Sequence, residues 1–148
     1  MYPCIQAEKT SGATDAEQIQ NAITEAKKSG TNRVCIPRHN DRTGADIWSI
    51  DRTVFLPSDI EIVLDNAHLR LADGVFCNMF ANENLTKEIS RTSAGEQKNI
   101  TLRGIGNAIL DGGIYNGLSE KNSLQDGRPH ISVNTTLLFF NVSNLRVE

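Results

Sequence analysis

Three aspartates stand where acid–base chemistry is possible. Asp65, Asp73 and Asp111 each end a strand-like run, and each has Asn or Gly beside it. Inverting glycoside hydrolysis uses an acid and a base carboxylate roughly 6.5–9.5 Å apart. Asp in such a context also caps turns, because it bonds to backbone groups and tolerates unusual backbone angles. We expect turn capping at all three positions and therefore predict no catalytic residue in this chain.

The histidines and cysteines lack the spacing of metal ligands. They are His39, His68, His130, Cys4, Cys35 and Cys77. The histidines have no ligand spacing among themselves, no cysteine has another at metal-binding spacing, and an odd cysteine count argues against a disulfide framework. Gly104 and Gly106 form no dinucleotide-binding loop, because no helix follows them. We predict no metal and no cofactor. We expect small buried cysteines, with one disulfide and one free thiol as the alternative.

Arg128 and His130 are the weak candidates for substrate binding. A guanidinium pairs well with a carboxylate, so these side chains can face a uronate from a groove. Arg128 lies in a predicted loop from Tyr115 to Pro129 that is rich in Asn, Ser, Gly and Asp. A plain turn is the alternative, since these residue types are typical of turns.

The elements that must position these residues are strands, and the clearest lie in Asn99–Gly113, NITLRGIGNAILDGG. Ile100 and Leu102 alternate with polar residues, which is the period of a strand with one buried face. Glycines then break the run, and a second apolar run closes on Asp111-Gly112-Gly113. The stretch predicts a strand, a corner, a second strand and a turn.

The same pattern recurs along the chain. Ser58–Gly74 repeats it, with Ile60 and Ile62 at the apolar positions, and Asn144–Val147 repeats its opening. The starts at 59, 99 and 144 lie 40 and 45 residues apart. Repetition at such spacing is typical of a solenoid, in which one unit cannot bury its own apolar face. An ordinary all-β domain with coincidental alternation is the alternative.

One amphipathic helix is predicted over residues 15–29. Thr14 and Glu17 form a capping box, in which a hydroxyl and a carboxylate each accept a free backbone N–H. Apolar residues follow at helical spacing, and Gly30 is a natural stop. The apolar stripe consists of Ala16, Ile19, Ala22, Ile23 and Ala26. Because one side of this helix is apolar, we expect it to cover the end of the strand array.

Further short strands are predicted around polar segments. They are Arg33–Pro37, Ile47–Ile50, Val54–Leu56 and Leu137–Phe140. Residues 38–46 predict a polar loop, and residues 77–98 an insertion with a helical turn near Leu85–Ile89. The final run, Asn144–Glu148, begins a unit with no stop signal after it. We therefore expect an N-terminal piece of a longer protein that can self-associate through this open strand.

The composition is that of a folded protein without a basic surface. The 148 residues are 39% hydrophobic and 22% charged, and the formal net charge is −3. This charge, without a basic cluster, argues against nucleic acid as a partner. No apolar run approaches the roughly 20 residues of a membrane helix, so no membrane partner is predicted. The opening residues, MYPCIQAEKT, lack the features of a secretion signal, so the compartment stays unknown.

These features together resemble the start of a right-handed parallel β-helix of the pectin-lyase type. Residues 12–23, GATDAEQIQNAI, are similar to the TDxxxIQxAI helix that opens such proteins, and Arg33–Pro37 resembles the following xVYIP strand. The closest resemblance is to the polygalacturonase family, glycoside hydrolase family 28. Asn99–Gly113 is similar to its segment NVTIxGxGxIDGxG. Arg128-Pro129, followed by an apolar run and Asn141-Val142, resembles another recurring feature.

The resemblance implies an all-β fold. It is a right-handed single-stranded parallel β-helix, a solenoid with an N-terminal capping α-helix at about 15–29. Residues 1–148 then form the N-terminal portion of one β-helix domain, with coils over about 33–148 and truncation at the C-terminal end.

The resemblance also implies a glycoside hydrolase of polygalacturonase type that acts on pectin-like polysaccharide. The family's catalytic aspartates lie in an Asn-Thr-Asp motif and an Asp-Asp pair, and Gly-His-Gly and Arg-Ile-Lys motifs complete the site. None of the four occurs here, and Asn134-Thr135-Thr136 lacks the acid. We expect a scaffold portion that is inactive alone and meets polysaccharide through the complete protein. The family resemblance also implies a secreted or periplasmic protein.

Two other functions remain open. A polysaccharide lyase on the same fold needs a basic residue to take the proton, usually with calcium to neutralise the uronate. A non-catalytic β-helix, as in a phage tail or surface adhesin, is a spacer or a binding rod. The Asp-Gly-Gly unit and the Arg-Pro feature favour the hydrolase.

Overall fold

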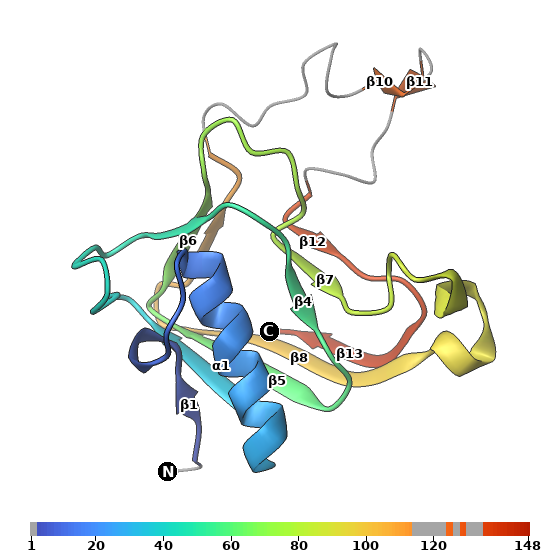
Figure 1. Cartoon of the computed structure of the whole chain (residues 1–148), viewed down its shortest axis with the longest axis horizontal. Helices are drawn as coiled ribbons and strands as arrows, with labels where there is room; N and C mark the ends of the chain where they lie inside the picture. Colours follow the sequence, from blue (N-terminus) through green and yellow to red (C-terminus); the bar gives the residue numbers. More distant parts are fainter. Residues whose placement is uncertain (1–2, 114–123, 126–127, 130–134) are drawn as a thin grey trace.

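The structure, a computed structural model, describes residues 3–113, 124–125, 128–129 and 135–148. Helix α1 (Asp15–Ser29) lies against the first strands, and most strands belong to three parallel sheets (Figure 1). Short 3-10 helices are η1 (Ala7–Lys9), η2 (Glu88–Arg91) and η3 (Ser93–Gly95). Within the described residues, no helix is both long and apolar enough to cross a membrane.

The bounds and contacts of α1 confirm the predicted helix. Thr14 Oγ1 accepts the Glu17 N–H at 3.2 Å, and Glu17 Oε2 accepts the Ala13 N–H at 3.2 Å. Gly30 ends the helix with a φ of 76°, a left-handed conformation that glycine adopts without strain. The predicted apolar stripe is buried along its whole length. The helix therefore packs its apolar side on the sheets.

Most of the described strands form one large sheet and two smaller ones. The large sheet is parallel and has the order β1 (Ile5–Gln6), β2 (Arg33–Pro37), β5 (Ile60–Asp65), β8 (Gln97–Ile105), β13 (Val142–Val147). A second parallel sheet has the order β3 (Trp48–Ile50), β6 (His68–Leu71), β9 (Ile109–Asp111). The third has the order β12 (Leu137–Leu138), β7 (Phe80–Asn82), β4 (Val54–Leu56). The short strands β10 (Leu124–Gln125) and β11 (Arg128–Pro129) pair antiparallel.

The predicted repeat starts lie side by side. Strand β5 pairs with β8, and β8 with β13, all in parallel. Asp59 lies directly before β5, whereas Asn99 and Asn144 lie within β8 and β13, and the three residues have φ of 56°, 57° and 53°. Asn144 Nδ2 donates to Asn99 Oδ1 at 2.8 Å, and Asn99 Nδ2 donates to Asp59 Oδ1 at 2.6 Å. The recurrence in sequence thus marks a corner that is built the same way three times.

The core lies between α1 and the inward faces of the sheets. Alternate strand residues point into it, including Ile62 and Leu102 in the large sheet. Trp48, the single tryptophan of the chain, is fully buried, and its Nε1 donates to the Pro37 carbonyl at 2.8 Å. This packing fixes the second sheet, β3–β6–β9, against the helix.

The fold class expected from the resemblance is wrong. We expected an all-β right-handed parallel β-helix, with the helix only covering its end. The structure is instead a mixed α/β domain, in which α1 contributes seven buried residues and the parallel sheets have five, three and three strands. The described residues form no closed solenoid. Apolar alternation predicts strands, but it does not reveal how many join each sheet or how much of the core a helix supplies.

The irregular segment 77–98 also differs in detail from the expectation. It contains β7, η2 and η3, and its helical turn begins at Glu88 rather than near Leu85. The strands expected at Arg33–Pro37 and Val54–Leu56 are present as β2 and β4. Sequence patterns therefore placed the strands more closely than the short helical turns, because a single turn has too few residues to show a period.

Candidate functional site

A row of outward side chains crosses the sheet β3–β6–β9. Ser49 pairs in register with Arg70, and Arg70 pairs with Asp111. Side chains alternate between the two faces of a strand, and the intervening Leu69 is buried in the core. The row therefore faces away from the core. His68, two residues before Arg70 on β6, lies on the same outer face.

The carboxylate of Asp111 is held by several neighbours. Its Oδ1 accepts the Gly113 N–H at 2.8 Å, the turn contact expected for this residue. Its Oδ2 lies 3.1 Å from His68 Nε2 and 3.8 Å from Arg70 Nε. The hydrogen bond from Gly113, followed by that from His68, lowers the pKa of Asp111. Asp111 is therefore poorly suited to donate a proton at neutral pH.

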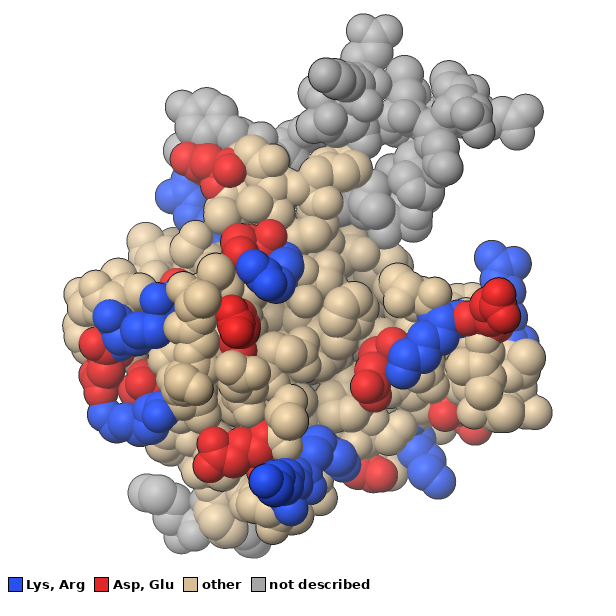
Figure 2. Space-filling view, viewed as in Figure 1, with Lys and Arg blue, Asp and Glu red and all other residues tan. Residues whose placement is uncertain are grey.

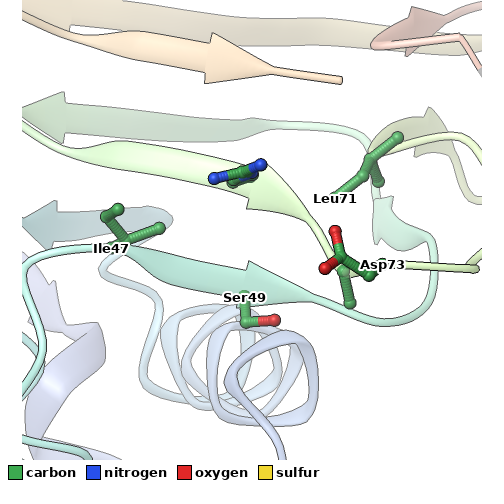
Figure 3. A pocket seen from close by; sticks show the side chains of 6 residues that line it. Ile47, Ser49, Leu71 and Asp73 are labelled. Atoms are coloured by element: carbon green, nitrogen blue, oxygen red, sulfur yellow. The ribbon is translucent and has the colours of Figure 1, made fainter. Parts of the chain in front are cut away.

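Two open cavities flank this row and meet at Ile47. One has a volume of about 220 Å³ and is lined by Ile47, Ser49, Arg70, Leu71, Ala72 and Asp73 (Figure 3). The other has about 300 Å³ and is lined by Ile47 with Arg38, Asp46, Asn66, His68, Asn107 and Ile109. We call these two adjoining cavities the trough. Its floor is the outer face of the second sheet.

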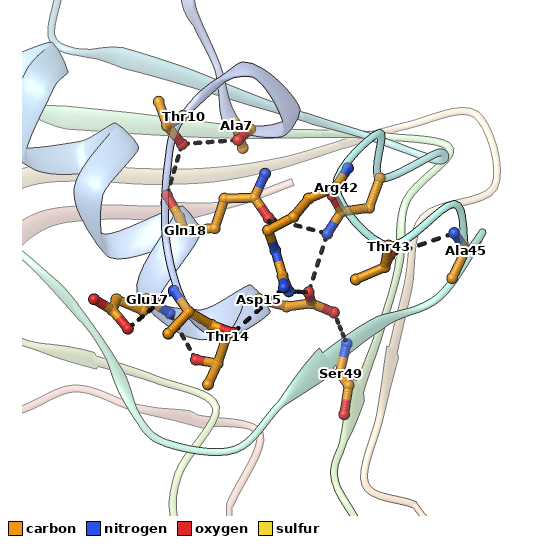
Figure 4. A network of polar contacts seen from close by, with 12 residues as sticks. Ala7, Thr10, Thr14, Asp15, Glu17, Gln18, Arg42, Thr43, Ala45 and Ser49 are labelled. Carbon is orange, nitrogen blue, oxygen red and sulfur yellow. Dashed lines mark hydrogen bonds and ion pairs between the residues drawn. The ribbon is translucent and has the colours of Figure 1, made fainter.

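A polar network fixes the loop 38–46, which forms one wall of the trough (Figure 4). Asn40 Nδ2 donates to Asp15 Oδ1 and to Gln18 Oε1, each at 3.1 Å. Arg42 pairs with Asp15 and donates from Nε to Gln18 Oε1 at 3.1 Å. Asp15 Oδ2 also accepts the Ser49 N–H of β3 at 2.6 Å. Because Asp15 is only 4% exposed, breaking this network would leave a buried charge unpaired.

Acidic and basic groups alternate around the trough. Arg38 Nε lies 3.2 Å from Asp46 Oδ2, and His39 Nδ1 lies 2.8 Å from Asp46 Oδ1. The hydrogen bond from His39 is the main cause that lowers the pKa of Asp46. Asp73 is exposed and has no hydrogen-bond or ion-pair partner among the described residues. On the face seen in Figure 2, acidic and basic side chains are likewise interspersed rather than gathered by sign.

Of the aspartates singled out from the sequence, two lie at the trough. Asp73 lines it beside Arg70, and Asp111 contacts Arg70 and His68. Asp65 ends β5 in the large sheet, where its Oδ1 accepts a hydrogen bond from Asn66 Nδ2 at 2.9 Å. The structure thus brings Asp73 and Asp111 near one arginine and leaves Asp65 on another sheet.

The weak binding candidates Arg128 and His130 fall mostly outside the described residues. Arg128 is placed only as a backbone position of β11, paired with Gln125. Its side chain and the whole of His130 lie outside the described part of the chain. A role for this pair in binding a uronate stays a prediction.

The cysteines are free thiols, and two of them line a third cavity. Cys4 and Cys35 lie on the outer face of the large sheet, in a cavity of about 440 Å³. Burial raises the pKa of Cys35 to about 12, and burial also raises that of Cys77. Such thiols form little thiolate at neutral pH, which disfavours a nucleophilic role. Within the described residues, no three His, Cys, Asp or Glu side chains gather as metal ligands do.

Three residues of the trough were not predicted from the sequence, namely Arg70, Ser49 and Ile47. A signal for Arg70 was present, because the corner Asn66-Ala67 matches Asn107-Ala108 in sequence. Counting four residues on from Asn66 and from Asn107 places Arg70 opposite Asp111. The pairing of β6 with β9 has the same register. Ser49 and Ile47 carried no such signal, since the short segment around β3 has no sequence counterpart of this kind.

Membership of a known family is not shown for this chain. Comparison with known proteins found no matching family model, no matching curated protein and no matching solved structure.

Proposed function

We propose that this chain is the scaffold portion of a carbohydrate-active enzyme of the polygalacturonase type, which acts on a pectin-like polysaccharide. The proposal rests on the resemblance of short sequence segments to that family and not on fold class. Asn99–Gly113 is similar to a segment of that family, and its Asp111 contacts His68 and Arg70 at the trough. The observation that supports the proposal is that a segment similar to this family places its aspartate beside an open polar trough.

We further propose that the chain cleaves no polysaccharide by itself. Inverting hydrolysis needs one protonated and one ionised carboxyl group, roughly 6.5–9.5 Å apart. Hydrogen bonds from Gly113 and His39 lower the pKa of Asp111 and of Asp46, respectively. Both carboxyl groups are therefore ionised at neutral pH, so neither serves as the acid. The sequence also lacks the family's four catalytic motifs.

Two measurements on the purified chain test the proposal. Electrophoresis through gels that contain pectin measures binding, because a bound protein is retarded. A reducing-end assay on polygalacturonate and on pectin measures hydrolysis. We expect retardation by pectin, together with no reducing ends above the buffer background. Absorbance of an unsaturated product, followed in the same samples, reports a lyase.

Either half of the proposal can be overturned separately. Unchanged migration in pectin gels would remove the assignment to a pectin-like polysaccharide. Reducing ends that form in proportion to the concentration of the chain would remove the claim of inactivity. The Asp73→Asn and Asp111→Asn variants would then show which carboxylate is catalytic.

A further inference from the structure

We propose that the trough binds an uncharged sugar unit of the polysaccharide. The inference rests on the proposed function, because pectin carries neutral sugars as well as uronates. To that function the inference adds a binding place on the chain, the trough, and the charge of the sugar that binds there. Three features of the trough favour such a ligand: its apolar floor, its hydrogen-bonding groups and its charge balance.

Two exposed isoleucines give the trough an apolar floor. Ile47 is 40% exposed and Ile109 is 38% exposed, although isoleucine is among the residue types most often buried. Both line the same cavity, and Ile47 also lines the adjoining one. A sugar ring carries C–H groups on its faces, so it can cover these side chains and remove apolar surface from water.

The polar groups beside this floor suit hydroxyl groups. In the adjoining cavity, which Ile47 also lines, Arg70 and Ser49 bring N–H and O–H donors, and Asp73 brings a carboxylate that only accepts. A hydroxyl both donates and accepts, so one sugar can bond to a donor and an acceptor at once. Ser49 and Arg70 stand on paired strands, and Asp15 holds β3 from the helix side. Groups held this way lose little freedom when a ligand binds.

The charge balance favours a neutral ligand over an anionic one. Arg38 already lies 3.2 Å from Asp46, and Arg70 lies 3.8 Å from Asp111. Asp73 adds a negative charge that has no ion-pair partner among the described residues. A uronate would be repelled by this surplus charge, whereas a hydroxyl would donate a hydrogen bond to it. The trough therefore accepts a neutral sugar more readily than a uronate.

A titration with two ligands of equal length tests this inference. The ligands are a neutral galacto-oligosaccharide and an oligogalacturonate, and amide NMR spectra of the chain report binding. We expect the neutral ligand to shift the amide signals of Ile47, Ser49 and Ala72. Its affinity should not change between low and high salt, because no ion pair forms. The oligogalacturonate should leave these signals in place.

Matched variants identify the groups responsible. Arg70→Met and Ile47→Ser should each weaken binding of the neutral ligand by about tenfold, the effect of one or two lost neutral contacts. Asp73→Asn removes the surplus charge, so it should bring the oligogalacturonate into the trough. Arg91→Met and Glu96→Gln are the controls, because both residues are exposed and line none of the trough. Emission of the buried Trp48 checks that each variant is folded.

Three results would overturn the inference. One is tighter, salt-dependent binding of the oligogalacturonate at the same amides. Another is equal loss of binding in the control variants and in Arg70→Met. The last is retardation by pectin without any shift at the trough, in which case the proposed function stands and the sugar binds elsewhere. Absence of retardation, with the neutral oligosaccharide still bound, would instead overturn the proposed function and leave the trough as a sugar site.

Discussion

Asn99 combines a left-handed backbone with two side-chain hydrogen bonds. Its φ is 57°, and its side chain donates to Asp59 and accepts from Asn144. Asparagine tolerates this conformation better than residues such as alanine, for which it costs about 1–2 kcal/mol. The sequence shows where such residues stand, because Asp59, Asn99 and Asn144 open similar runs.

We predict that Asn99→Ala is more destabilising than Asn99→Gly. Glycine keeps the backbone conformation and loses only the hydrogen bonds, at a cost of about 1 kcal/mol. Alanine loses the bonds and is also strained, so its free energy of unfolding should fall by about 1 kcal/mol more. Urea unfolding followed by Trp48 emission measures both. Lys98→Ala, at an exposed neighbour with negative φ, is the control. Equal losses in the two variants would show that the backbone is unstrained.

The lowered pKa of Asp111 predicts in which direction the stability of the fold changes with pH. Folding favours the ionised carboxylate of Asp111. Its contribution to the stability of the fold is therefore fully present above the ordinary carboxyl pKa of 3.8, and it is lost as pH falls through the lower pKa of the folded state. Asp111→Asn should therefore reduce the melting temperature at neutral pH. The difference from the wild type should shrink as pH drops below about 4.

A second variant separates the two hydrogen bonds to this carboxylate. His68→Gln removes one neighbour of Asp111 and leaves the Gly113 N–H in place, so its effect should be smaller than that of Asp111→Asn. Melting curves recorded from neutral pH to about pH 3 measure both variants. A gap between Asp111→Asn and the wild type that widens towards acid pH would contradict the assignment.

Helix α1 belongs to the core and not only to its rim. Ile19 is fully buried on the side that faces the strands. We predict that Ile19→Asp lowers the free energy of unfolding by roughly 3–5 kcal/mol, because it buries an unpaired charge. Glu25→Asp places an aspartate on the exposed side of the same helix and should be nearly neutral. Circular dichroism melting curves compare the two variants, and an unchanged Ile19→Asp would show that the helix does not support the core.

Local sequence patterns predicted the individual helix and strands, but they did not predict how these elements assemble. Thr14, Glu17 and Gly30 fixed the helix from local chemistry alone, and alternation located most of the strands. The contribution of the helix to the core and the unequal sizes of the sheets depend on contacts between distant segments. The trough shows the same division, since the turn context of Asp111 is a local sequence signal, whereas the place of Ser49 beside Arg70 depends on the pairing of β3 with β6.

Across the whole molecule, burial decreases towards one edge of the large sheet. In one inward row, Ile62 and Leu102 are 0% and 2% exposed, whereas Val147 of β13 is 56% exposed. In a neighbouring row, Ile100 is 0% exposed and Leu145 is 38% exposed. Strand β13 is an edge of the described sheet, so its outer backbone groups can pair with another strand.

We propose that this edge makes the chain self-associate. Exposed apolar side chains beside an unpaired strand edge favour contact with a second chain, because contact buries the side chains and pairs the backbone. In sedimentation or light-scattering experiments, the average mass should rise above the 16.3 kDa of one chain as concentration increases. Val147→Lys and Leu145→Lys should suppress this rise, because lysine at a strand edge opposes pairing. Ile47→Lys is the matched control, since Ile47 is 40% exposed and lies directly before β3, which belongs to a different sheet. A mass that stays at one chain, or a rise that the β13 variants leave unchanged, would show that the open edge is not an interface.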